Sequence, residues 1–452
     1  MIAFLYRLAW SAARPLAAPL SATGGKLGRA IRGRRAAAAA LATWASRGRR
    51  PDAPLVWLHG ASVGEGRQAE AVLRRLRAAR PDWQIAYTFS SPSAERWAAG
   101  LPADVAAYLP FDTARETGVA LDALRPAALV FSATDVWPEL VRQAARRHVA
   151  LGVVSATLAP TSSRRGQLAR RLLQPAYAAL DRVGAIDAAD AAGLAALGVA
   201  PGRIVVTGDT RHDAALARVA ALAPDAPPPH LRALRAAADG RPLLVAGSTW
   251  PSDERVLLPA LAAARARGAR CRLVIAPHEP TPGHLAALEG AIRRDLEPGI
   301  TAVRLSALLL PGTVPPPAAG NVPSGIGDVV VVDTVGVLGE LYPAASLAYV
   351  GGGFHGKGLH SVIEPAAAGV PVVFGPRWHG SRDARLLLDA GGAAAAADVA
   401  GLTAVLTRWL NDETARASAA LAARAVVERG QGAADRSVEL VTELVERRLA
   451  LT

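Results

Sequence analysis

The feature that most constrains the fold of this chain is the alternation, from residue 54 onward, of short apolar runs with longer stretches rich in Ala, Leu and Arg. The short runs have the length of buried strands. The longer stretches place apolar residues at intervals of three and four, as amphipathic helices do, for example at Ala69, Val72, Leu73, Leu76 and Ala79. Such alternation is typical of βαβ units with parallel strands. We therefore predict an α/β fold with parallel sheets.

The predicted strands form two sets, at 55–59, 84–88, 128–131, 150–154, 183–186 and 204–206, and at 242–246, 272–276, 328–332, 347–350 and 370–374. Between the sets, ALAPDAPPPHLRALRAAA at 221–238 predicts a linker followed by a short helix. We divide the chain into an N-terminal segment (1–50), a first α/β domain (51–220), a linker (221–240), a second α/β domain (241–425) and a C-terminal helix (426–452). Two such lobes with a cleft between them place the ligand site at the carboxyl ends of the strands.

The chain carries an excess of positive charge that is almost wholly arginine. Lys and Arg number 51 against 38 Asp and Glu, a formal net charge of +13, and Lys26 and Lys357 are the only lysines. This charge favours anionic partners: acidic lipids, phosphorylated substrates or nucleic acids. No aromatic-rich strand, zinc finger or compact helix-turn-helix pattern supports a nucleic acid. Cys271 is the single cysteine, which excludes an intramolecular disulfide and a cysteine zinc cluster and agrees with a reducing compartment.

The N-terminal segment is apolar over about the length of a membrane-spanning helix, but Arg7, Arg14 and Pro15 interrupt it. A basic run, KLGRAIRGRR at 26–35, follows, and the aromatic residues of the segment are Phe4, Tyr6 and Trp10. This pattern predicts an amphipathic helix that lies in, or dips into, an anionic cytoplasmic leaflet. Two alternatives stay open, an uncleaved signal-type anchor and an ordinary helix packed on the protein body.

Three strand-to-helix turns are rich in small or polar residues, and the first is HGASVGEGRQAE at 59–70. Ser62 and Glu65 have the S-x-x-E spacing of a capping box, in which both side chains satisfy N–H groups at the start of a helix. The alternative role of Glu65 is that of a general base, because a carboxylate near a helix N-terminus stays ionised and can accept a proton. The spacing alone favours the cap over the base.

The second turn is AGSTWPSDE at 246–254. Small residues after a strand let backbone N–H groups approach a phosphate at the start of the following helix. The alternative is plain helix initiation, since Pro251 suits a first helical turn and Asp253 and Glu254 suit the helix dipole.

The third turn is GGGFHGKGLHSVIEP at 351–365, where glycines, Lys357 and two histidines precede a helix. A phosphate cradle is the natural interpretation, although the turn matches neither G-x-x-x-x-G-K-[ST] nor a strict G-x-G-x-x-G. Ser361 and Glu364 repeat the capping-box spacing, so that Glu364 is either structural or an acceptor for ribose hydroxyls.

Several histidines and serines lie where other kinds of chemistry would be possible. His278 in IAPHEP directly follows a strand, which favours a role facing the cleft. His278, His355 and His360 are candidates to meet in space, but no H-x-x-x-H or H-E-x-x-H pattern supports a metal. The serines of the three turns lack the G-x-S-x-G elbow, which argues against a serine hydrolase.

Taken in order, several blocks resemble the family of transferases for 3-deoxy-D-manno-octulosonic acid (Kdo), which attach Kdo to a lipid A precursor from a CMP-activated donor. The blocks are HGASVGE at 59–65, DVWPEL at 135–140, VTGDTRHD at 206–213, AGSTWPSDE at 246–254, IAPHEP at 275–280, VVDTVGVLGELY at 331–342 and GGGFHGKGLHSVIEPAAAGVPVVFGP at 351–376. The resemblance covers nearly the whole chain, and blocks in the right order are far more specific than any single one.

The resemblance implies a GT-B glycosyltransferase with two Rossmann-like lobes, an acceptor bound mainly by the first and a nucleotide by the second, without a cofactor or required metal. It implies that Glu65 deprotonates a sugar hydroxyl of the lipid, beside the acceptor-binding residues Ser62 and Gly64, and that Arg211 stabilises developing charge. The implied donor contacts are Ser248, Thr249, Pro277, His278, Gly336, Val337, Leu338, Lys357, His360, Ser361 and Glu364. The leaving phosphate would meet backbone N–H groups at 247–250 and 360–362.

The chain departs from the family pattern in several motifs, which places it in a divergent branch. The family's E-T-E-x-W-P becomes Ala133, Thr134, Asp135, Val136, Trp137 and Pro138, so that Asp135 stands where the second Glu was. The usual P-R-H becomes Ala276, Pro277 and His278, G-E-L becomes Gly336, Val337 and Leu338, and G-G-H-N becomes Gly358, Leu359, His360 and Ser361. The lost arginine of P-R-H suggests that Lys357 supplies its charge.

The resemblance therefore predicts an inverting transferase that uses CMP-Kdo and a lipid A precursor in lipopolysaccharide synthesis. It would act on an anionic membrane surface, at the cytoplasmic face of the inner membrane. A GT-B transferase for another nucleotide sugar is the first alternative, because a fold does not fix the donor. A basic nucleic-acid-binding protein is the second.

Overall fold

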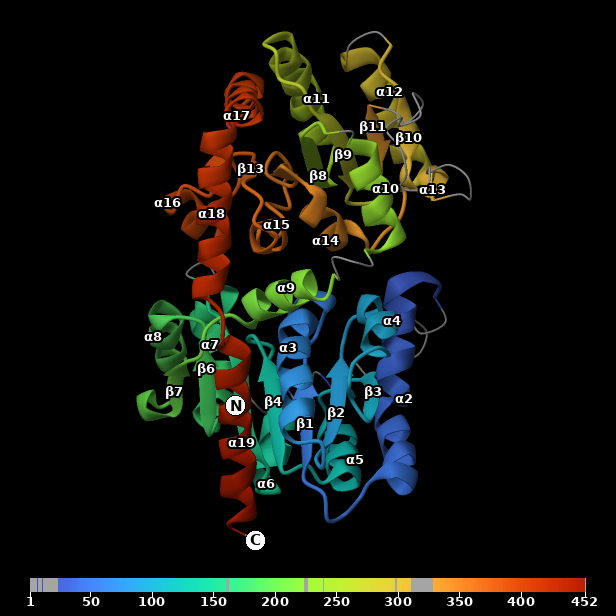
Figure 1. Cartoon of the computed structure of the whole chain (residues 1–452). Coiled ribbons are helices and arrows are strands. Elements are labelled where there is room, and N and C mark those ends of the chain that lie inside the picture. Colours follow the sequence, from blue (N-terminus) through green and yellow to red (C-terminus); the bar gives the residue numbers. More distant parts are fainter. Residues whose placement is uncertain are drawn as a thin grey trace. The chain divides into compact units, whose positions relative to one another are not determined.

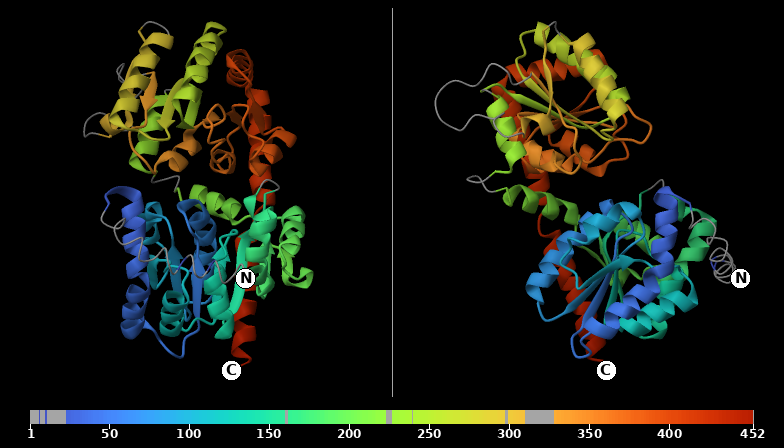
Figure 2. Two further views of the ribbon diagram at one scale, coloured as in Figure 1. Left: turned by 180° about the vertical axis from the view of Figure 1, so that it is seen from behind. Right: turned by 90° about the vertical axis from the view of Figure 1, so that its right-hand side faces the viewer.

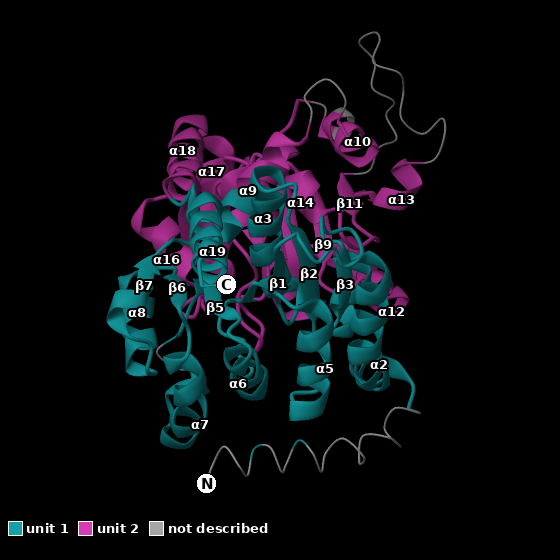
Figure 3. Ribbon diagram, turned by 90° about the horizontal axis from the view of Figure 1, so that it is seen from below, with its two compact units in different colours: residues 1–214, 430–452 teal, residues 215–429 magenta. Residues whose placement is uncertain are grey.

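The computed structural model describes residues 6, 10, 23–159, 162–222, 227–238, 240–296, 299–309 and 328–451 (Figure 1). The chain forms two compact units, coloured separately in Figure 3. Unit 1 comprises residues 1–214 and 430–452, and unit 2 comprises residues 215–429. Each unit is built on one seven-stranded sheet in which all strands are parallel.

In unit 1 the strand order is β3-β2-β1-β4-β5-β6-β7. The strands are β1 (Leu55–His59), β2 (Gln84–Phe89), β3 (Val105–Tyr108), β4 (Ala128–Ser132), β5 (Ala150–Ala156), β6 (Arg182–Ala185) and β7 (Ile204–Val206). The helices are α2 (Gly25–Gly48), α3 (Val63–Ala79), α4 (Glu95–Ala98), α5 (Ala114–Leu124), α6 (Pro138–Arg146), α7 (Gln167–Ala178), α8 (Ala188–Ala196) and α19 (Ala433–Leu449). Helix α9 (Thr210–Ala220) begins in unit 1 and ends in unit 2.

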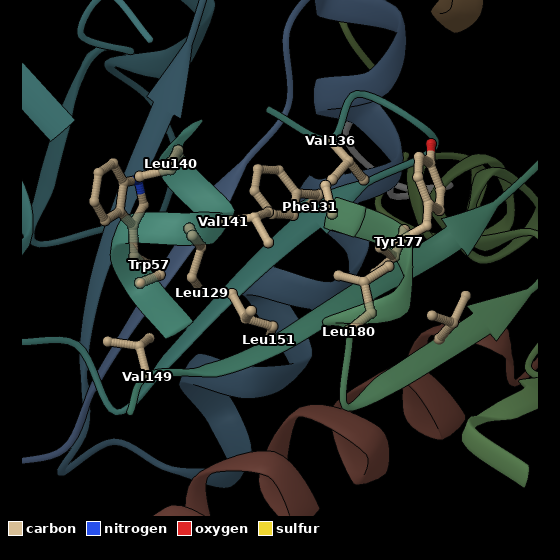
Figure 4. Packing of buried hydrophobic residues seen from close by; sticks show 14 of the residues in the cluster. Trp57, Leu129, Phe131, Val136, Leu140, Val141, Val149, Leu151, Tyr177 and Leu180 are labelled. Atoms are coloured by element: carbon tan, nitrogen blue, oxygen red, sulfur yellow. The ribbon is translucent and has the colours of Figure 1, made fainter. Parts of the chain in front are cut away.

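Helices cover both faces of this sheet, and successive strand residues supply the two cores. Leu55 and Trp57 point into one core, together with side chains of α2, α5, α6 and α7 (Figure 4). Val56 and Leu58 point into the other, which α3 and α19 close. Because both faces of the sheet are covered, its central strands are predominantly apolar rather than alternating.

In unit 2 the strand order is β10-β11-β9-β8-β12-β13-β14. The strands are β8 (Leu243–Thr249), β9 (Arg272–Pro277), β10 (Ala302–Arg304), β11 (Val329–Val331), β12 (Leu347–Val350), β13 (Val372–Phe374) and β14 (Ala393–Ala395). The helices are α10 (Pro229–Ala238), α11 (Pro251–Ala266), α12 (Pro282–Asp295), α13 (Leu305–Leu308), α14 (Leu338–Leu341), α15 (Ile363–Ala367), α16 (Arg382–Asp389), α17 (Val399–Asn411) and α18 (Glu413–Arg429). They again flank the sheet on both sides (Figure 2).

The predicted α/β class with parallel sheets is confirmed, and every predicted strand is present with ends shifted by at most a few residues. The sequence analysis missed β3, β10 and β14, which all lie at sheet edges. These strands have three or four residues, and β14 is Ala-Ala-Ala, the strongest helix former. Only pairing with a neighbouring strand makes such segments extended.

The chain changes units at residues 214 and 215, ahead of the proline-rich segment, and returns at residue 430. The predicted linker contains α10, a helix of unit 2. The predicted C-terminal helix is split at Gly430 to Gly432, so that α18 belongs to unit 2 and α19 to unit 1. Asp213 holds the start of α19, because its carboxylate accepts hydrogen bonds from the N–H groups of Gly432 (2.7 Å) and Ala434 (3.0 Å).

Within residues 1–22 the structure describes Tyr6 and Trp10 alone, and both residues are helical. The Tyr6 hydroxyl donates to Asp112 Oδ2 (2.7 Å), and the Trp10 ring lies 5.9 Å from the rings of Phe111 and Trp137. These two aromatic side chains therefore pack on the protein body, as in the alternative of an ordinary packed helix. Phe4, Arg7, Arg14 and Pro15 lie outside the described residues. No helix among the described residues combines the length and the apolar character that crossing a membrane requires.

Candidate functional site

Each sheet has one point at which the strand order reverses, between β1 and β4 in unit 1 and between β8 and β12 in unit 2. Ligands of such folds bind beyond the carboxyl ends of the strands at this point. Three residues near these strand ends adopt the left-handed backbone conformation: Ala133 (φ 60°) just after β4, Ser155 (φ 50°) near the end of β5 and Ser248 (φ 54°) near the end of β8. Backbone strain of this kind is concentrated at functional sites.

In unit 1, Glu65 lies in the first turn of α3, directly after the end of β1. The capping box is formed: the Ser62 N–H and hydroxyl donate to Glu65 Oε2 (2.9 and 3.1 Å), and the Glu65 N–H donates to Ser62 Oγ (3.5 Å). No described residue contacts Oε1 of this half-buried carboxylate within hydrogen-bond distance. The Ser132 hydroxyl donates to the Glu65 carbonyl (3.0 Å), which fixes the end of β4 beside the turn. One carboxylate oxygen is thus held and the other left for a ligand.

Asp135 follows β4 and is held by three side chains. His59 Nε2 (3.3 Å) and Trp137 Nε1 (3.0 Å) both contact Oδ2, and Arg164 lies 3.7 Å from Oδ1. Burial by itself would raise the pKa of this carboxyl. The hydrogen bonds from His59 and Trp137 and the charges of His59 and Arg164 outweigh burial and lower the pKa below its usual value. Asp135 is therefore an oriented, ionised carboxylate.

The sequence analysis does not identify His59 as a site residue. In the structure it is the last residue of β1, and its side chain is fully buried. Its Nδ1 lies 2.9 Å from the Thr88 carbonyl oxygen and 3.0 Å from Thr88 Oγ1, on the neighbouring strand. A buried polar residue in an apolar strand was the signal available in the sequence.

Trp137 has a second partner besides Asp135, the guanidinium of Arg34 from α2. This group lies 4.6 Å from the Trp137 ring centroid, 5.1 Å from that of Phe111 and 5.4 Å from that of Trp10. Burial lowers the pKa of Arg34 below its usual value, although nearby Asp112 opposes the shift. Three rings around one cation connect the N-terminal segment with the residue that orients Asp135.

Arg211 lies in the first turn of α9, and Asp209 binds its guanidinium. Arg211 Nε lies 2.9 Å from Asp209 Oδ2, and the buried carboxylate also accepts the Arg211 backbone N–H (3.0 Å). The Thr210 hydroxyl donates to the Gln68 carbonyl (2.9 Å) of α3, which keeps the start of α9 beside the helix that carries Glu65.

In unit 2, the centre of the site is Asp253, which the sequence analysis considered only for the helix dipole. Its side chain is fully buried. Oδ2 accepts the N–H groups of Trp250 and Gly352 (both 2.9 Å), and Oδ1 accepts the Phe354 N–H and the Tyr349 hydroxyl (both 3.1 Å). Burial and the Asp253 charge raise the pKa of Tyr349 well above its usual value. Asp253 thus anchors the glycine-rich turn to the start of α11.

This anchoring corrects the predicted phosphate cradle. The N–H groups of Gly352 and Phe354 are bound by Asp253, that of Trp250 likewise, and the His360 N–H donates to the Gly351 carbonyl (3.1 Å). Two of the backbone groups expected to meet a leaving phosphate, at 250 and 360, are therefore occupied by the protein. Within the described chain, the N–H groups of Ser361 and Val362 have no acceptor and stay candidates.

Trp250 gathers three histidines and Lys357 beside this turn. The His355 ring stacks on the indole (4.2 Å, 8°), His278 lies 4.7 Å away, and Lys357 Nζ lies 4.7 Å above the indole centroid. His360 stacks on His278 (4.4 Å) and accepts the indole N–H at Nε2 (3.0 Å). The expected meeting of His278, His355 and His360 is confirmed, but as a ring stack. In the described parts of the chain, no three His, Cys, Asp or Glu side chains are placed to hold a metal ion.

The neighbouring positive charges affect the histidines. Burial, the neighbouring His278, His355 and Lys357 lower the pKa of His360 to about 4, against the opposing effect of Asp253. Burial also lowers the pKa of His278. His360 is therefore neutral at pH 7, as its role of accepting the indole N–H requires.

Five of the other predicted donor residues lie at or after the ends of strands in unit 2. Pro277 and Ser248 lie at the ends of β9 and β8, and the His278 N–H donates to the Thr249 carbonyl (2.9 Å). Leu338 lies against Gly247, where a Cβ would come within 2.8 Å of the leucine. Gly336 and Val337 precede α14. These residues reach the carboxyl edge of the sheet.

Thr249, Ser361 and Glu364 depart from the predictions. The Thr249 side chain is fully buried and donates to Glu254 Oε1 (2.9 Å), so that it supports the fold. The predicted capping box at 361–364 is wrong, because α15 begins at Ile363 after Val362, which makes no side-chain cap. Arg218 binds the Glu364 carboxylate instead, and Ser361 is exposed.

Residues 33–214 match the family described as 3-Deoxy-D-manno-octulosonic-acid transferase (kdotransferase). The chain is 29% identical over 412 residues to 3-deoxy-D-manno-octulosonic acid transferase of Bordetella pertussis, covering 88% of this chain and 89% of that one. It is 28% identical over 369 residues to the transferase of the same name from Chlamydophila psittaci, covering 81% and 79%.

Solved structures resemble both units at low sequence identity. UDP-GlcNAc 2-epimerase from Neisseria meningitidis matches with a TM-score of 0.60 at 14% identity, covering 86% of this chain and all of that one. MurG from Acinetobacter baumannii matches with a TM-score of 0.51 at 15% identity, covering 86% and 99%. At this identity the likeness concerns the fold, and the predicted GT-B fold is confirmed.

Proposed function

Because residues 33–214 match the 3-deoxy-D-manno-octulosonic acid transferase family and relatives of that name are similar over most of the chain, we propose that this chain is a member and transfers Kdo from CMP-Kdo to a lipid A precursor in lipopolysaccharide synthesis. The observation that carries this proposal is the similarity to the Bordetella pertussis transferase, which extends over 88% of the chain and therefore through both units. Membership alone does not fix the donor or the acceptor. The arrangement of the two sites supports both assignments.

We assign proton acceptance to Glu65. Its Oε2 is held by Ser62, and its Oε1 is available to take the proton of an acceptor hydroxyl. The hydroxyl oxygen then forms a bond to the anomeric carbon of Kdo while the bond from that carbon to the CMP phosphate breaks, with inversion. A single base suffices for this displacement. Ser62 and Gly64, in the same turn, are assigned to the acceptor.

Asp135 and Arg211 are assigned to charge placement in the same unit. Asp135, kept ionised by His59, Trp137 and Arg164, would accept a hydrogen bond from a second acceptor hydroxyl. Arg211 would meet the phosphate or the Kdo carboxylate, with a guanidinium whose orientation Asp209 fixes.

Donor binding is assigned to the carboxyl edge of the unit 2 sheet. Lys357 extends from the glycine-rich turn over Trp250, and among the described acidic side chains none forms an ion pair with it. Lys357, the neutral His360 and the N–H groups of Ser361 and Val362 would bind the CMP phosphate. Glu364, which Arg218 orients, would accept ribose hydroxyls.

The direct test is incubation of the purified full-length chain with CMP-Kdo and a tetraacylated lipid A precursor, followed by mass spectrometry. The expected product is the precursor with added Kdo, and its absence alongside an active relative would overturn the proposal. Competition of CMP against UDP for binding tests the alternative of another nucleotide sugar, which tighter binding of UDP would favour.

Action at the cytoplasmic face of the inner membrane is part of the proposal. The exposed basic residues of the run at 26–35, which are Lys26, Arg29, Arg32 and Arg35, and the apolar character of the preceding residues support it. Full-length protein should sediment with anionic vesicles at low salt, and salt should weaken this binding without abolishing it. A protein that stays in the supernatant at low salt would contradict the membrane assignment.

A further inference from the structure

We propose that a groove between α6 and α7 of unit 1 binds one acyl chain of an anionic lipid. The identification of that lipid with the acceptor rests on the proposed function, whereas the groove itself is a separate observation. It encloses about 600 Å³, within the range of sites for small ligands. Its wall includes Tyr6, and its apolar lining consists of Pro138, Val141 and Ala145 from α6 and Leu172, Pro175 and Ala179 from α7 and its end.

Helix α7 presents an apolar stripe that the protein body leaves partly uncovered. Of its residues, only Ala176 and Tyr177 are buried. Leu168, Leu172, Pro175 and Ala179 recur at helical spacing on one side, which extends the groove lining by one turn to Leu168. The Leu168 side chain is 72% exposed. An apolar stripe that leads from solvent into a groove fits a flexible hydrocarbon chain.

Positive charge lines the rim of the same groove. Arg142 and Arg146 contribute to its wall, and Arg171 is exposed on α7 next to the apolar stripe. Arg142 is neutralised by the buried Glu139. Arg146 and Arg171 form no ion pair with any acidic side chain in the described parts of the chain. Apolar walls with unpaired cations at the rim complement an acyl chain that ends in an anionic group.

The groove also starts beside the candidate site of unit 1. Pro138 is the first residue of α6 and directly follows Trp137, whose indole donates to Asp135 (3.0 Å). From Pro138 the lining runs along α6 to Arg146, near its end. An acyl chain whose anionic group lies at Arg146 would therefore extend along α6 toward the candidate site of the same unit.

The test uses dodecyl phosphate as the probe, kept below its micelle concentration, and calorimetric titration of the full-length chain. We expect one site per chain, with affinity at least 100-fold above that for butyl phosphate, because each buried methylene adds to binding. Leu172→Trp should fill the groove and weaken dodecyl phosphate binding at least 10-fold. Ala145→Trp should do the same from an exposed position, where an added side chain leaves the core intact.

The charge arm compares two arginines. Arg146→Glu should weaken dodecyl phosphate binding about 10-fold while leaving the neutral dodecyl maltoside unaffected. Arg270→Glu, the same charge change at an exposed position of unit 2 without an ion pair among described residues, is the matched control and should change neither.

Equal affinity for butyl and dodecyl phosphate, or wild-type affinity in both tryptophan variants, would overturn the proposal. Variants that lose sedimentation with anionic vesicles but bind monomeric dodecyl phosphate normally would also overturn it, because the face would then contact a bilayer rather than hold one chain. Probe binding needs neither donor nor turnover. A chain that binds the probe without transferring Kdo would thus refute the proposed function alone.

Discussion

Glu65 in unit 1 and Asp253 in unit 2 occupy the same place in their units. Each is the third residue after the N-cap of the helix that follows the first strand of its sheet, and each accepts the N-cap backbone N–H at 2.9 Å. The half-buried carboxylate of Glu65 accepts hydrogen bonds only from Ser62 among the described residues. Its second oxygen has no described partner. Asp253 is fully buried, and both of its oxygens are used.

This difference shows that the same capping box can hold either a reactive carboxylate or a purely structural one. A carboxylate whose hydrogen bonds are all satisfied inside the protein cannot take a proton without breaking them. A carboxylate held by one oxygen is oriented and still reactive. The shorter Asp side chain faces a glycine-rich turn that comes close enough to bind it, because Gly351 and Gly352 leave no room for a Cβ. The comparison predicts opposite outcomes for mutations at the two positions.

The largest effect is expected for Asp253→Ala, on stability. It leaves the N–H groups of Trp250, Gly352 and Phe354 without their acceptor in a buried site. We expect the free energy of unfolding of unit 2 to fall by about 3 to 5 kcal/mol, measured by urea denaturation. Glu65→Ala is the matched control, with an expected loss of about 0.5 to 2 kcal/mol for a half-buried cap. Equal losses at the two positions would break the comparison.

Glu65→Gln should change activity and not stability. Gln can still accept the Ser62 N–H in the capping box, but it cannot act as a base. We expect Kdo transfer to slow by at least ~100-fold, with a melting temperature close to that of the wild type. Near-normal turnover would return Glu65 to a purely structural role, and the two units would then use this position alike.

Lys357→Ala tests the glycine-rich turn that Asp253 holds in place. Removing a charge-assisted contact worth about 1.5 to 3 kcal/mol should weaken CMP binding by about 10-fold to 150-fold in calorimetric titration, with acceptor binding unchanged. Lys26→Ala, at the other lysine of the chain, controls for lost charge. If Lys357 is only a solvated residue of the turn, both variants will bind CMP like the wild type.

The sequence was sufficient for features that depend on local pattern. Strands buried on both faces are continuous apolar runs, and the capping box of Ser62 and Glu65 is readable from spacing. It was insufficient where a residue's partner lies far along the chain. Asp253 looks like a dipole-matching acid until Gly352, 99 residues later, is brought to it. The same holds for Glu364, whose carboxylate is bound by Arg218, 146 residues away.

The smallest expected effect is on the pH dependence of the free energy of unfolding, and it arises from His360 in unit 2. Burial and the neighbouring His278, His355 and Lys357 lower the pKa of His360 to about 4 in the folded chain, against the opposing effect of Asp253. In the unfolded chain the group has its ordinary pKa of about 6.5. Between these values the unfolded state binds the extra proton, so that His360 supports stability above pH 6.5 and this contribution is lost as the pH falls towards 4.

His278, whose pKa burial also lowers, acts in the same direction. His360→Gln removes the titrating group, while its side-chain oxygen can still accept the Trp250 indole N–H. We therefore expect the free energy of unfolding, measured by urea denaturation from pH 7 to pH 4, to fall less steeply in this variant than in the wild type. A wild-type slope in His360→Gln would mean that the imidazole is protonated in the folded chain near its ordinary pKa, and that the ring stack around Trp250 tolerates a further positive charge.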